Sequence, residues 1–411
     1  MSAAIYDWRR IPGGPRVAAA NIAGAECVAM SVHVPAGGRD DADAPAGLAH
    51  FVEHMVFKGT ARRTARELSI EIENSGCQVN AYTSEDQTVY EGRGEAGSFD
   101  VLADVLCDMV WHAAFPEQEI VLEREVIGEE IAMIHDTPSD YIGDMLSTAL
   151  WGAHPLGRPI SGTTASIAAI DRAALVSSRD RHHLREDVVI SVAGPFDIDD
   201  VLGRIRGLLP ESWHVAPRSM PFDAACAAPA SLVESRDTGQ LQLALGWHTC
   251  GRMSASRHTL RLLSLILGDS ASSRLFLSLR EERGLCYQIS SDVSLLEETG
   301  ALEIHAGLEP ENRDEAIDLI RREIRDLANH GPRPGELDRA KRLAITQAKL
   351  AFETTSAHAA WAADGLLDFG RIPSPAEWRS EINRVSDRDL REIAAQVFTR
   401  DPSTAEIRPL P

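Results

Sequence analysis

Apolar and polar positions along the chain form a series of patterns that occurs twice. In the first half, an alternating run at 78–92, typical of paired strands, precedes helical patterns at 98–115 and, after Pro116, at 117–136. In the second half, an alternating run at 287–309 precedes helical patterns at 312–331 and 335–353. Matching Glu119 to Glu336 gives an offset of 336 - 119 = 217, close to half the chain, so we expect an internal duplication.

The segment between the two halves shows neither the alternating pattern of a strand nor the periodicity of a helix. Residues 216–231 are rich in proline, alanine and serine, which is typical of a linker. With 411 residues the chain exceeds what one hydrophobic core usually organises. We therefore predict two domains, 1–215 and 232–411, of the α+β class, each a mostly antiparallel sheet covered by helices.

The charge balance restricts the partners of the protein. Lysine and arginine total 41 against 62 acidic residues, a formal charge of -21 that repels nucleic acids and anionic membranes. The acidic excess favours cationic peptides as ligands, or it only keeps the surface solvated, and both interpretations stay open. The cysteines stand singly, no apolar window reaches the length of a membrane span, and we expect a cytoplasmic protein.

The stretch GLAHFVEHMVFKGT contains two histidines four positions apart. Pro45 can open a helix here and Gly59 can close it, so we expect about three helical turns. His50 and His54 then lie on one face, one turn apart, where two imidazoles can bind one metal ion, with Glu53 on the flank of that face. The alternative is an amphipathic helix whose polar residues face water.

The helix after Pro116 offers carboxylates on a face predicted to be buried. Glu123 and Glu130 lie two turns apart within an apolar stripe, whereas Glu125 and Glu129 point away from it. The stripe consists of Ile120, Val126, Ile127, Ile131, Met133 and Ile134. A catalytic zinc ion needs three protein ligands and one open position. We expect one of the two carboxylates to bind the metal and the other to orient the ligands, and the pattern leaves open which.

Together these motifs resemble the inverzincins, the pitrilysin and insulin-degrading-enzyme family, whose signature is HxxEH. The length is most similar to that of the mitochondrial-processing-peptidase subfamily and its bacterial relatives. The resemblance spans nearly the whole chain, through GLAHFVEHMVFKGT, VNAYTSEDQTVY, LEREVIGEEI, HPLGRPISGT and SSRLFLSLREERGLCY. It implies that His50, His54 and Glu130 bind one zinc ion per chain, that Glu53 is the general base, and that Glu123 supports the ligands from behind.

The second half lacks a zinc site of its own. The positions 217 residues after Glu123 and Glu130 are Ala340 and Gln347. By the resemblance, Arg280 and Tyr287 of the stretch LREERGLCY reach the active site from this domain and hold the substrate backbone and the developing oxyanion. The alternative is a cation favourably placed at a helix C-terminus and a tyrosine suited to a strand.

Two further expectations concern residues outside the zinc signature. The resemblance also implies a strand edge to which a peptide adds as an extra strand. This edge consists of Asn80, Ala81, Tyr82 and Thr83. His182 and His183 have charged neighbours and adjacent spacing, so we expect them to be surface residues.

The resemblance implies a zinc metalloendopeptidase with a clam-like pair of halves enclosing a chamber. It hydrolyses unfolded peptides with water activated by zinc and Glu53. Because the zinc ligands, Arg280 and Tyr287 occur in one chain, a homodimer is the simplest expectation, and a heterodimer with a related subunit is the alternative. The alternative functions are a non-catalytic structural or partner subunit of the same family and a dedicated precursor-processing peptidase.

Overall fold

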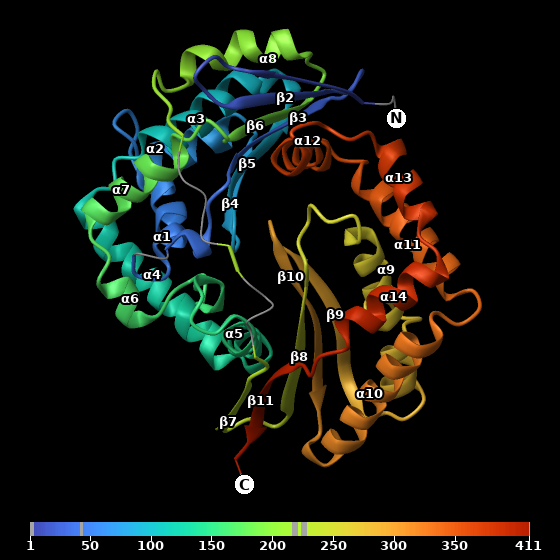
Figure 1. The fold of residues 1–411 in the computed structure, drawn as a ribbon. Helices are drawn as coiled ribbons and strands as arrows, with labels where there is room; N and C mark the ends of the chain where they lie inside the picture. The colour runs from blue at the N-terminus through green and yellow to red at the C-terminus, as the bar shows by residue number, and fades with distance from the viewer. Residues whose placement is uncertain (1–3, 42–43, 216–220, 223–227, 411) are drawn as a thin grey trace. The chain divides into compact units, whose positions relative to one another are not determined.

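The computed structural model describes residues 4–41, 44–215, 221–222 and 228–410. The chain forms two compact units, each assembled from three separate stretches (Figure 1). Unit 1 comprises residues 1–131, 158–220 and 349–373, and unit 2 comprises 132–157, 221–348 and 374–411. The predicted linker, 216–231, lies mostly outside the described residues, so the predicted domain boundaries stay a prediction.

Unit 1 is built on a six-stranded mixed sheet of order β1-β2-β6-β3-β5-β4. Its strands are β1 Ile5–Arg10, β2 Arg16–Asn21, β3 Cys27–Val34, β4 Gln78–Thr83, β5 Thr88–Glu95 and β6 Val189–Gly194. The β2–β6 pair is parallel and the other pairs are antiparallel. The helices are α1 Leu48–Met55, α2 Ala65–Asn74, α3 Phe99–His112, α4 Glu117–Asp136, α6 Thr164–Ala168, α7 Arg172–His183, α8 Ile198–Ile205 and α12 Thr355–Phe369.

Helices cover both faces of the centre of this sheet. On one face, Ala18 and Val189 pack against Ala362, Ala363 and Leu366 of α12. Small side chains on both elements allow this close approach. On the other face the apolar strand residues join α1, α3 and α8 in the main core of the unit. The strands β2, β3 and β6 are therefore buried on both faces, whereas β4 forms an edge of the sheet.

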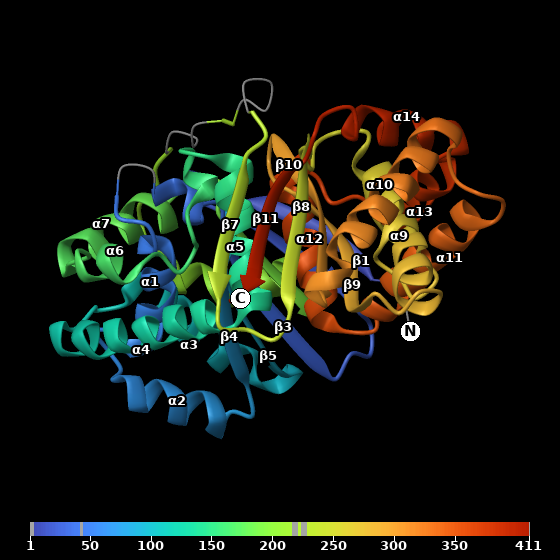
Figure 2. The same cartoon turned by 90° about the horizontal axis from the view of Figure 1, so that it is seen from below.

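Unit 2 repeats this plan with a five-stranded sheet of order β7-β11-β8-β10-β9 (Figure 2). Its strands are β7 Ser231–Arg236, β8 Leu241–Cys250, β9 Cys286–Leu295, β10 Thr299–Leu308 and β11 Ser403–Pro409. Its helices are α5 Pro138–Trp151, α9 Arg257–Leu267, α10 Arg313–His330, α11 Glu336–Ala351, α13 Pro375–Arg384 and α14 Asp387–Val397. The β7–β11 pair is parallel, like β2–β6 at the same place in the first sheet. The predicted α+β class with two similar halves is confirmed.

Two helices belong to the unit opposite to the one their sequence position suggests. Helix α5 follows α4 in the chain, yet Ile142, Leu146 and Leu150 pack on Ala244 and Ala405 of the unit 2 sheet. Helix α12 lies in the second half of the sequence and packs on the sheet of unit 1. The first residues of the two helices are 355 - 138 = 217 positions apart, the offset predicted for the duplication. Each half therefore contributes one helix to the sheet of the other unit.

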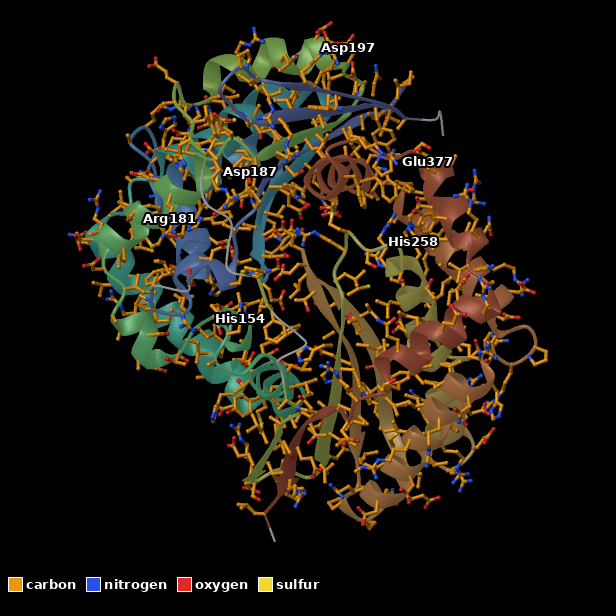
Figure 3. The ribbon with its side chains drawn as sticks, in the orientation of Figure 1. His154, Arg181, Asp187, Asp197, His258 and Glu377 are labelled. Carbon is orange, nitrogen blue, oxygen red and sulfur yellow. The ribbon has the colours of Figure 1, made fainter. Side chains whose placement is uncertain are left out.

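Polar side chains cap the N-termini of several helices. Asp197 accepts hydrogen bonds from the backbone N–H groups of Asp199 and Asp200 at 3.0 and 2.9 Å, at the start of α8 (Figure 3). Ser374 and Glu377 form a capping box at the start of α13. No helix in the described parts of the chain is long and apolar enough to cross a membrane. The five cysteines among the described residues are free thiols.

Candidate metal centre

The histidine pair lies on α1, which begins later than predicted and continues through a 3-10 turn that ends, as predicted, at Gly59. The α-helix begins at Leu48, three residues after Pro45, and its last turn, Val56–Lys58, is a 3-10 helix. The N-cap Gly47 has φ 90° and no side chain to cap the helix. Instead, the buried carboxylate of Asp41 accepts a hydrogen bond from the N–H of Ala49 at 3.2 Å. A residue outside the helix thus supplies the N-terminal acceptor.

Gly47 is required by its backbone as well as by its surroundings. Its positive φ is strained for any residue with a side chain. A Cβ atom there would lie 2.6 Å from Cδ1 of Ile167 and 2.8 Å from the carbonyl oxygen of Ser161. This close packing fixes the start of the helix that carries both histidines.

Three potential ligands converge at one point of unit 1. The Nε2 atoms of His50 and His54 lie 3.2 Å apart, and Oε2 of Glu130 lies 3.9 and 3.5 Å from them. These three atoms are within 4.8 Å of one another, and within the described residues no other group of three or more histidine, cysteine or acidic residues is so arranged. Oε2 of Glu130 is buried without a hydrogen-bond partner in the described chain. Two imidazole nitrogens and one carboxylate oxygen are donors that suit zinc.

Glu123 lies behind the ligands and fixes one of them. Its Oε1 is 2.8 Å from Nδ1 of His54, and its Oε2 is 2.5 Å from Nζ of Lys58. Burial alone would raise the pKa of Glu123, but the hydrogen bonds from His54 and Lys58 outweigh burial and lower it. With Nδ1 of His54 donating to this carboxylate, the lone pair of Nε2 is directed to the metal centre. Lys58 was not predicted as part of the site. Its role follows from its ion pair with Glu123, which no spacing pattern in the sequence indicates.

The surroundings shift the pKa values of the two histidines in opposite directions. Burial, followed by the charge of His54, lowers the pKa of His50 to about 4, so its imidazole is neutral at pH 7. For His54, burial lowers the pKa, but the surrounding carboxylates, Glu123 first among them, outweigh burial and raise it. The rings meet edge to face with centroids 4.5 Å apart. An acidic environment that favours a positive charge at this point also favours a bound cation.

Glu53 occupies the flank of the centre, as predicted. Its side chain is buried, and Oε2 accepts a hydrogen bond from the hydroxyl of Thr83 at 2.9 Å. Burial raises the pKa of Glu53, although Thr83 and His54 oppose this effect. The carboxylate is therefore a stronger base than a solvated glutamate. The alternative of a polar face turned to water is wrong for this helix, since His50 and His54 are also largely shielded from solvent.

Helix α4 places Glu123 on its buried face, as predicted, but the side chain of Glu130 is 39% exposed, and part of the predicted apolar stripe is exposed as well. Ile120, Glu123 and Ile127 are buried. Val126 and Met133, assigned to the same stripe, are 49% and 63% exposed. These two side chains therefore lie outside the buried face of the helix.

The predicted substrate strand is an edge strand. Residues 80–83 belong to β4, which pairs with β5 on one side only within the described chain. The side chain of Thr83 reaches Glu53, whereas Tyr82, on the opposite face, is 43% exposed. The role of Asn80, Ala81, Tyr82 and Thr83 in substrate binding stays a prediction.

Arg280 and Tyr287 lie close together in unit 2. Arg280 is in the turn Phe276–Glu281, which is a π-helix, and Gly284 then reverses the chain with φ 62°. The guanidinium carbon of Arg280 lies 4.7 Å from the ring centroid of Phe276 and 5.3 Å from that of Tyr287. Tyr287 is the second residue of β9 and is 78% exposed. Their predicted contact with a substrate stays a prediction.

The expectation for the adjacent histidines is wrong. His183 is buried, and its Nε2 lies 2.8 Å from the hydroxyl of Tyr90. His182 is half-buried. The pair ends α7, and the helix packs against α1 and α3 with His183 turned inward. The sequence neighbours of His183 did not reveal this, because its hydrogen-bond partner, Tyr90, lies far away in the sequence.

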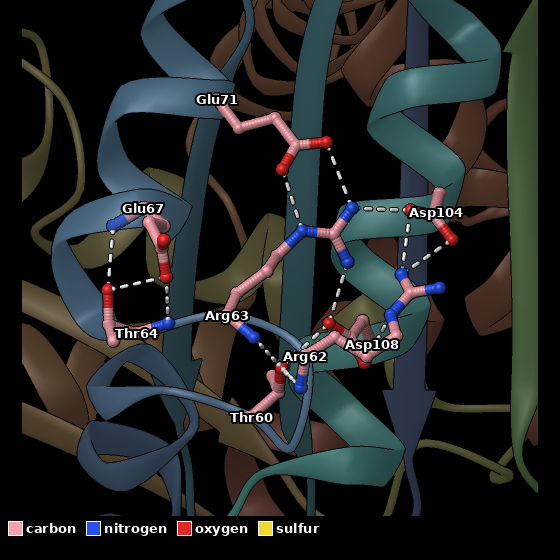
Figure 4. A network of polar contacts seen from close by, with 8 residues as sticks. All are labelled: Thr60, Arg62, Arg63, Thr64, Glu67, Glu71, Asp104 and Asp108. Carbon is pink, nitrogen blue, oxygen red and sulfur yellow. Dashed lines mark hydrogen bonds and ion pairs between the residues drawn. The ribbon is translucent and has the colours of Figure 1, made fainter.

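A network of ion pairs anchors the segment that follows the metal centre (Figure 4). Arg63 donates hydrogen bonds to Glu71 at 2.7 and 2.9 Å, to Asp104 at 2.5 Å and to Asp108 at 2.7 Å. The hydroxyl of Thr60 also donates to Asp108, at 2.8 Å. The network joins the loop after α1 to α2 and α3, so it holds the end of the histidine-bearing helix against the core.

Comparison with known protein families gives matches over most of the chain. Residues 16–164 match the family described as insulinase (peptidase family M16), and residues 169–344 match the family described as peptidase M16 inactive domain. The first match contains HxxEH and Glu130, and the second contains Arg280 and Tyr287.

Similar proteins and structures span the full length. An uncharacterized zinc protease of Mycobacterium leprae is 30% identical over 403 residues, 97% of this chain and 91% of the relative. An uncharacterized zinc protease of Bacillus subtilis is 31% identical over 396 residues, 96% of each chain. A solved protease from Helicobacter pylori has a TM-score of 0.91 at 19% identity, covering 99% of this chain and 100% of that one. A structure titled peptidase M16 inactive domain, from Pseudomonas fluorescens, has a TM-score of 0.90 at 18% identity, covering 99% and 98%.

Proposed function

The chain belongs to peptidase family M16, and we propose that it is a zinc-dependent endopeptidase that hydrolyses unfolded peptides. The observation that carries this proposal is the convergence of His50, His54 and Glu130. A buried carboxylate, Glu53, lies on α1, the helix that bears both histidines. Relatives that align over nearly the whole chain bear the name zinc protease, which supports the same conclusion.

In this proposal His50, His54 and Glu130 hold one zinc ion per chain. A zinc ion in such a centre is a Lewis acid that makes water a nucleophile near neutral pH and polarises a peptide carbonyl. Glu123 keeps the imidazole of His54 in the tautomer that binds metal through Nε2. Each of these side chains has a separate, testable contribution to metal affinity.

Glu53 is the proposed general base. Its burial and its raised pKa suit a group that first accepts a proton from water and then returns it to the leaving amine. The hydrogen bond from Thr83 orients the carboxylate and links it to the edge strand β4. A peptide that pairs with β4 would therefore pass beside the base.

Unfolded peptides are the proposed substrates because strand addition requires an extended backbone. Main-chain pairing along β4 would give affinity with little demand on sequence. We place the protein in the cytoplasm, where its free thiols would stay reduced. A homodimer also belongs to the proposal, and Arg280 and Tyr287 would bind the substrate backbone and the oxyanion.

The test is turnover of a quenched peptide of mixed sequence by zinc-loaded protein, with Glu53→Gln as the matched variant. The substitution preserves the shape of the side chain but removes the base. We expect turnover to fall by about a hundredfold or more while zinc content is unchanged. Wild-type protein that holds zinc and cleaves no peptide would instead favour a non-catalytic subunit or a narrow processing enzyme.

A further inference from the structure

The two proposed histidine ligands differ in what holds their imidazole rings. Nδ1 of His54 lies 2.8 Å from Oε1 of Glu123, whereas Nδ1 of His50 is buried and has no hydrogen-bond partner in the described chain. A metal-binding histidine usually donates its second N–H to an acceptor, which fixes the orientation of the ring. Without such an acceptor among the described residues, His50 depends for its position on the backbone that carries it.

The start of α1 sets this backbone, because His50 is the third residue of the helix. The first N–H groups of a helix have no acceptor within the helix and need one from elsewhere. Both carboxylate oxygens of Asp41 lie 3.2 Å from the backbone nitrogen of Ala49, the residue directly before His50. Asp41 is only 3% exposed, so the packing around it holds this carboxylate in place. Asp41 therefore fixes the backbone directly before His50.

A loop from a distant part of the sequence holds the segment that leads from Asp41 into α1. Arg158 lies in the stretch HPLGRPISGT, and its Nη1 donates to the carbonyl oxygens of Asp41 and Ala44 at 3.2 and 3.4 Å. Further along the chain, the hydroxyl of Ser166 donates to the carbonyl oxygen of Ala46 at 2.8 Å. The segment before the helix is thus bonded at three carbonyl groups.

The loop also packs directly against the backbone of this segment. Gly162 has φ 76°, and a Cβ atom there would lie 2.4 Å from the carbonyl oxygen of Ala46. A Cβ atom on Gly47 would lie 2.8 Å from the carbonyl oxygen of Ser161. Glycine at both positions allows the two backbones to approach more closely than side chains would permit. A metal site tolerates deviations of only about 0.2 Å in its ligand distances, so a support of this closeness is suited to a ligand-bearing helix.

We propose that Arg158 and Asp41 are positioning residues of the metal centre, which place the imidazole of His50 through the first turn of α1. Neither residue belongs to the ligand set, and each acts through the backbone between Asp41 and His50. The inference rests on the proposed zinc centre and extends it to a loop outside the HxxEH signature. It gives the two histidines separate supports, the loop for His50 and Glu123 for His54.

The experiment measures metal binding by the full-length protein and does not depend on peptide turnover. Arg158→Met removes the donor and keeps the length of the side chain, and Arg158→Lys restores one charged donor. Arg16→Met is the matched control, because Arg16 also donates to backbone carbonyl groups in unit 1, those of Asp187 and Leu366, but from β2. Zinc affinity is measured by competition with a chromophoric chelator, and the visible absorption of the cobalt(II)-loaded protein reports the geometry of the bound ion. Burial raises the pKa of Asp41 to about 7, so measurements at pH 8 keep most of its carboxylate ionised.

We expect Arg158→Met to weaken zinc binding by about tenfold or more and to shift the cobalt absorption bands. Arg158→Lys should recover zinc affinity to within about threefold of wild type. Arg16→Met should lower the unfolding temperature of the metal-free protein, but it should keep zinc affinity within about twofold and leave the cobalt spectrum unchanged. Asp41→Asn keeps one acceptor oxygen for the N–H of Ala49, and it should weaken zinc binding by about threefold and shift the cobalt bands slightly.

A folded Arg158→Met protein with the zinc affinity and cobalt spectrum of wild type would overturn the inference. Equal changes in Arg16→Met would also overturn it, because a general loss of stability would then explain the effect. If Arg158→Met does not fold, Asp41→Asn decides, and an unchanged cobalt spectrum in that variant would overturn the inference. Wild-type protein that binds neither zinc nor cobalt would refute the zinc centre and the inference with it, whereas zinc-loaded protein that cleaves no peptide would count against the peptidase function alone.

Discussion

The substitution Glu123→Gln tests how much the hydrogen bond between Glu123 and Nδ1 of His54 contributes to metal binding. Glu123 is buried and accepts two charge-assisted hydrogen bonds, from His54 at 2.8 Å and from Lys58 at 2.5 Å. Glutamine keeps the size of the side chain and an oxygen acceptor for His54, but it removes the negative charge. The imidazole then becomes a weaker base and a weaker ligand.

The size of the effect follows from which contact is lost. Loss of a carboxylate partner to a metal-binding histidine usually costs about 10–100-fold in metal affinity, equivalent to about 1.4–2.7 kcal/mol at 1.36 kcal/mol per decade. Lys58 is 28% exposed and can turn to solvent when its partner is neutral, so it adds little to this cost. We therefore expect Lys58→Met to change the zinc affinity less than about threefold.

The assay is competition for zinc with a chromophoric chelator, at constant pH. Glu125→Gln is the control, because Glu125 is exposed on the same helix. Thermal unfolding of the metal-free proteins shows whether each variant is folded. A Glu123→Gln protein that is folded and binds zinc within twofold of wild type would refute the reasoning that this carboxylate supports His54.

Three further predictions concern the scaffold around the centre. Arg63→Met should lower the free energy of unfolding by about 3–5 kcal/mol, because the buried carboxylate of Asp108 loses its 2.7 Å ion pair and keeps, among the described residues, only the longer ion pair with Arg62 at 3.4 Å. Arg62→Met, at a side chain 53% exposed, should cost less than about 1 kcal/mol in the same denaturant titration. For His183, burial first, then the charges of neighbouring cationic side chains, lower the pKa from 6.5 to about 3, so its contribution to stability is complete above pH 6.5 and is lost as pH falls towards 3. Denaturation at pH 7.5 and pH 5 should differ by about 2 kcal/mol from this group, and a pH dependence unchanged in His183→Gln would contradict the assignment. Gly47→Ala should cost about 1–3 kcal/mol through its positive φ and weaken zinc binding, and normal stability in calorimetry would exclude that strain.

The sequence carried enough information to predict which side chains meet at the centre. The spacing of His50 and His54 is a property of one helix, and the positions of Glu123 and Glu130 on a wheel follow from helical geometry. Neither depends on how the helices pack. The choice between the two glutamates depends on packing, since it is the distance to Nδ1 or to Nε2 of His54 that distinguishes them.

The wrong predictions from the sequence concern features that tertiary packing determines, namely which residues are buried and which surface a helix packs against. Val126 is apolar yet exposed, because a wheel does not show how wide a neighbouring surface is. His183 is buried, because Tyr90, far away in the sequence, supplies its hydrogen-bond partner. The exchange of α5 and α12 between the two sheets was missed for the same reason, since apolar periodicity identifies a buried face but not the surface that covers it.

The most direct test of the account is zinc content measured beside peptide turnover in three proteins: wild type, Glu53→Gln and His54→Gln. Elemental analysis after metal-replete purification should give about one zinc ion per chain for wild type and Glu53→Gln, and much less for His54→Gln. Turnover should be present in the wild type alone. Zinc that remains bound in His54→Gln, or turnover that persists in Glu53→Gln, would contradict the assignment of ligand and base.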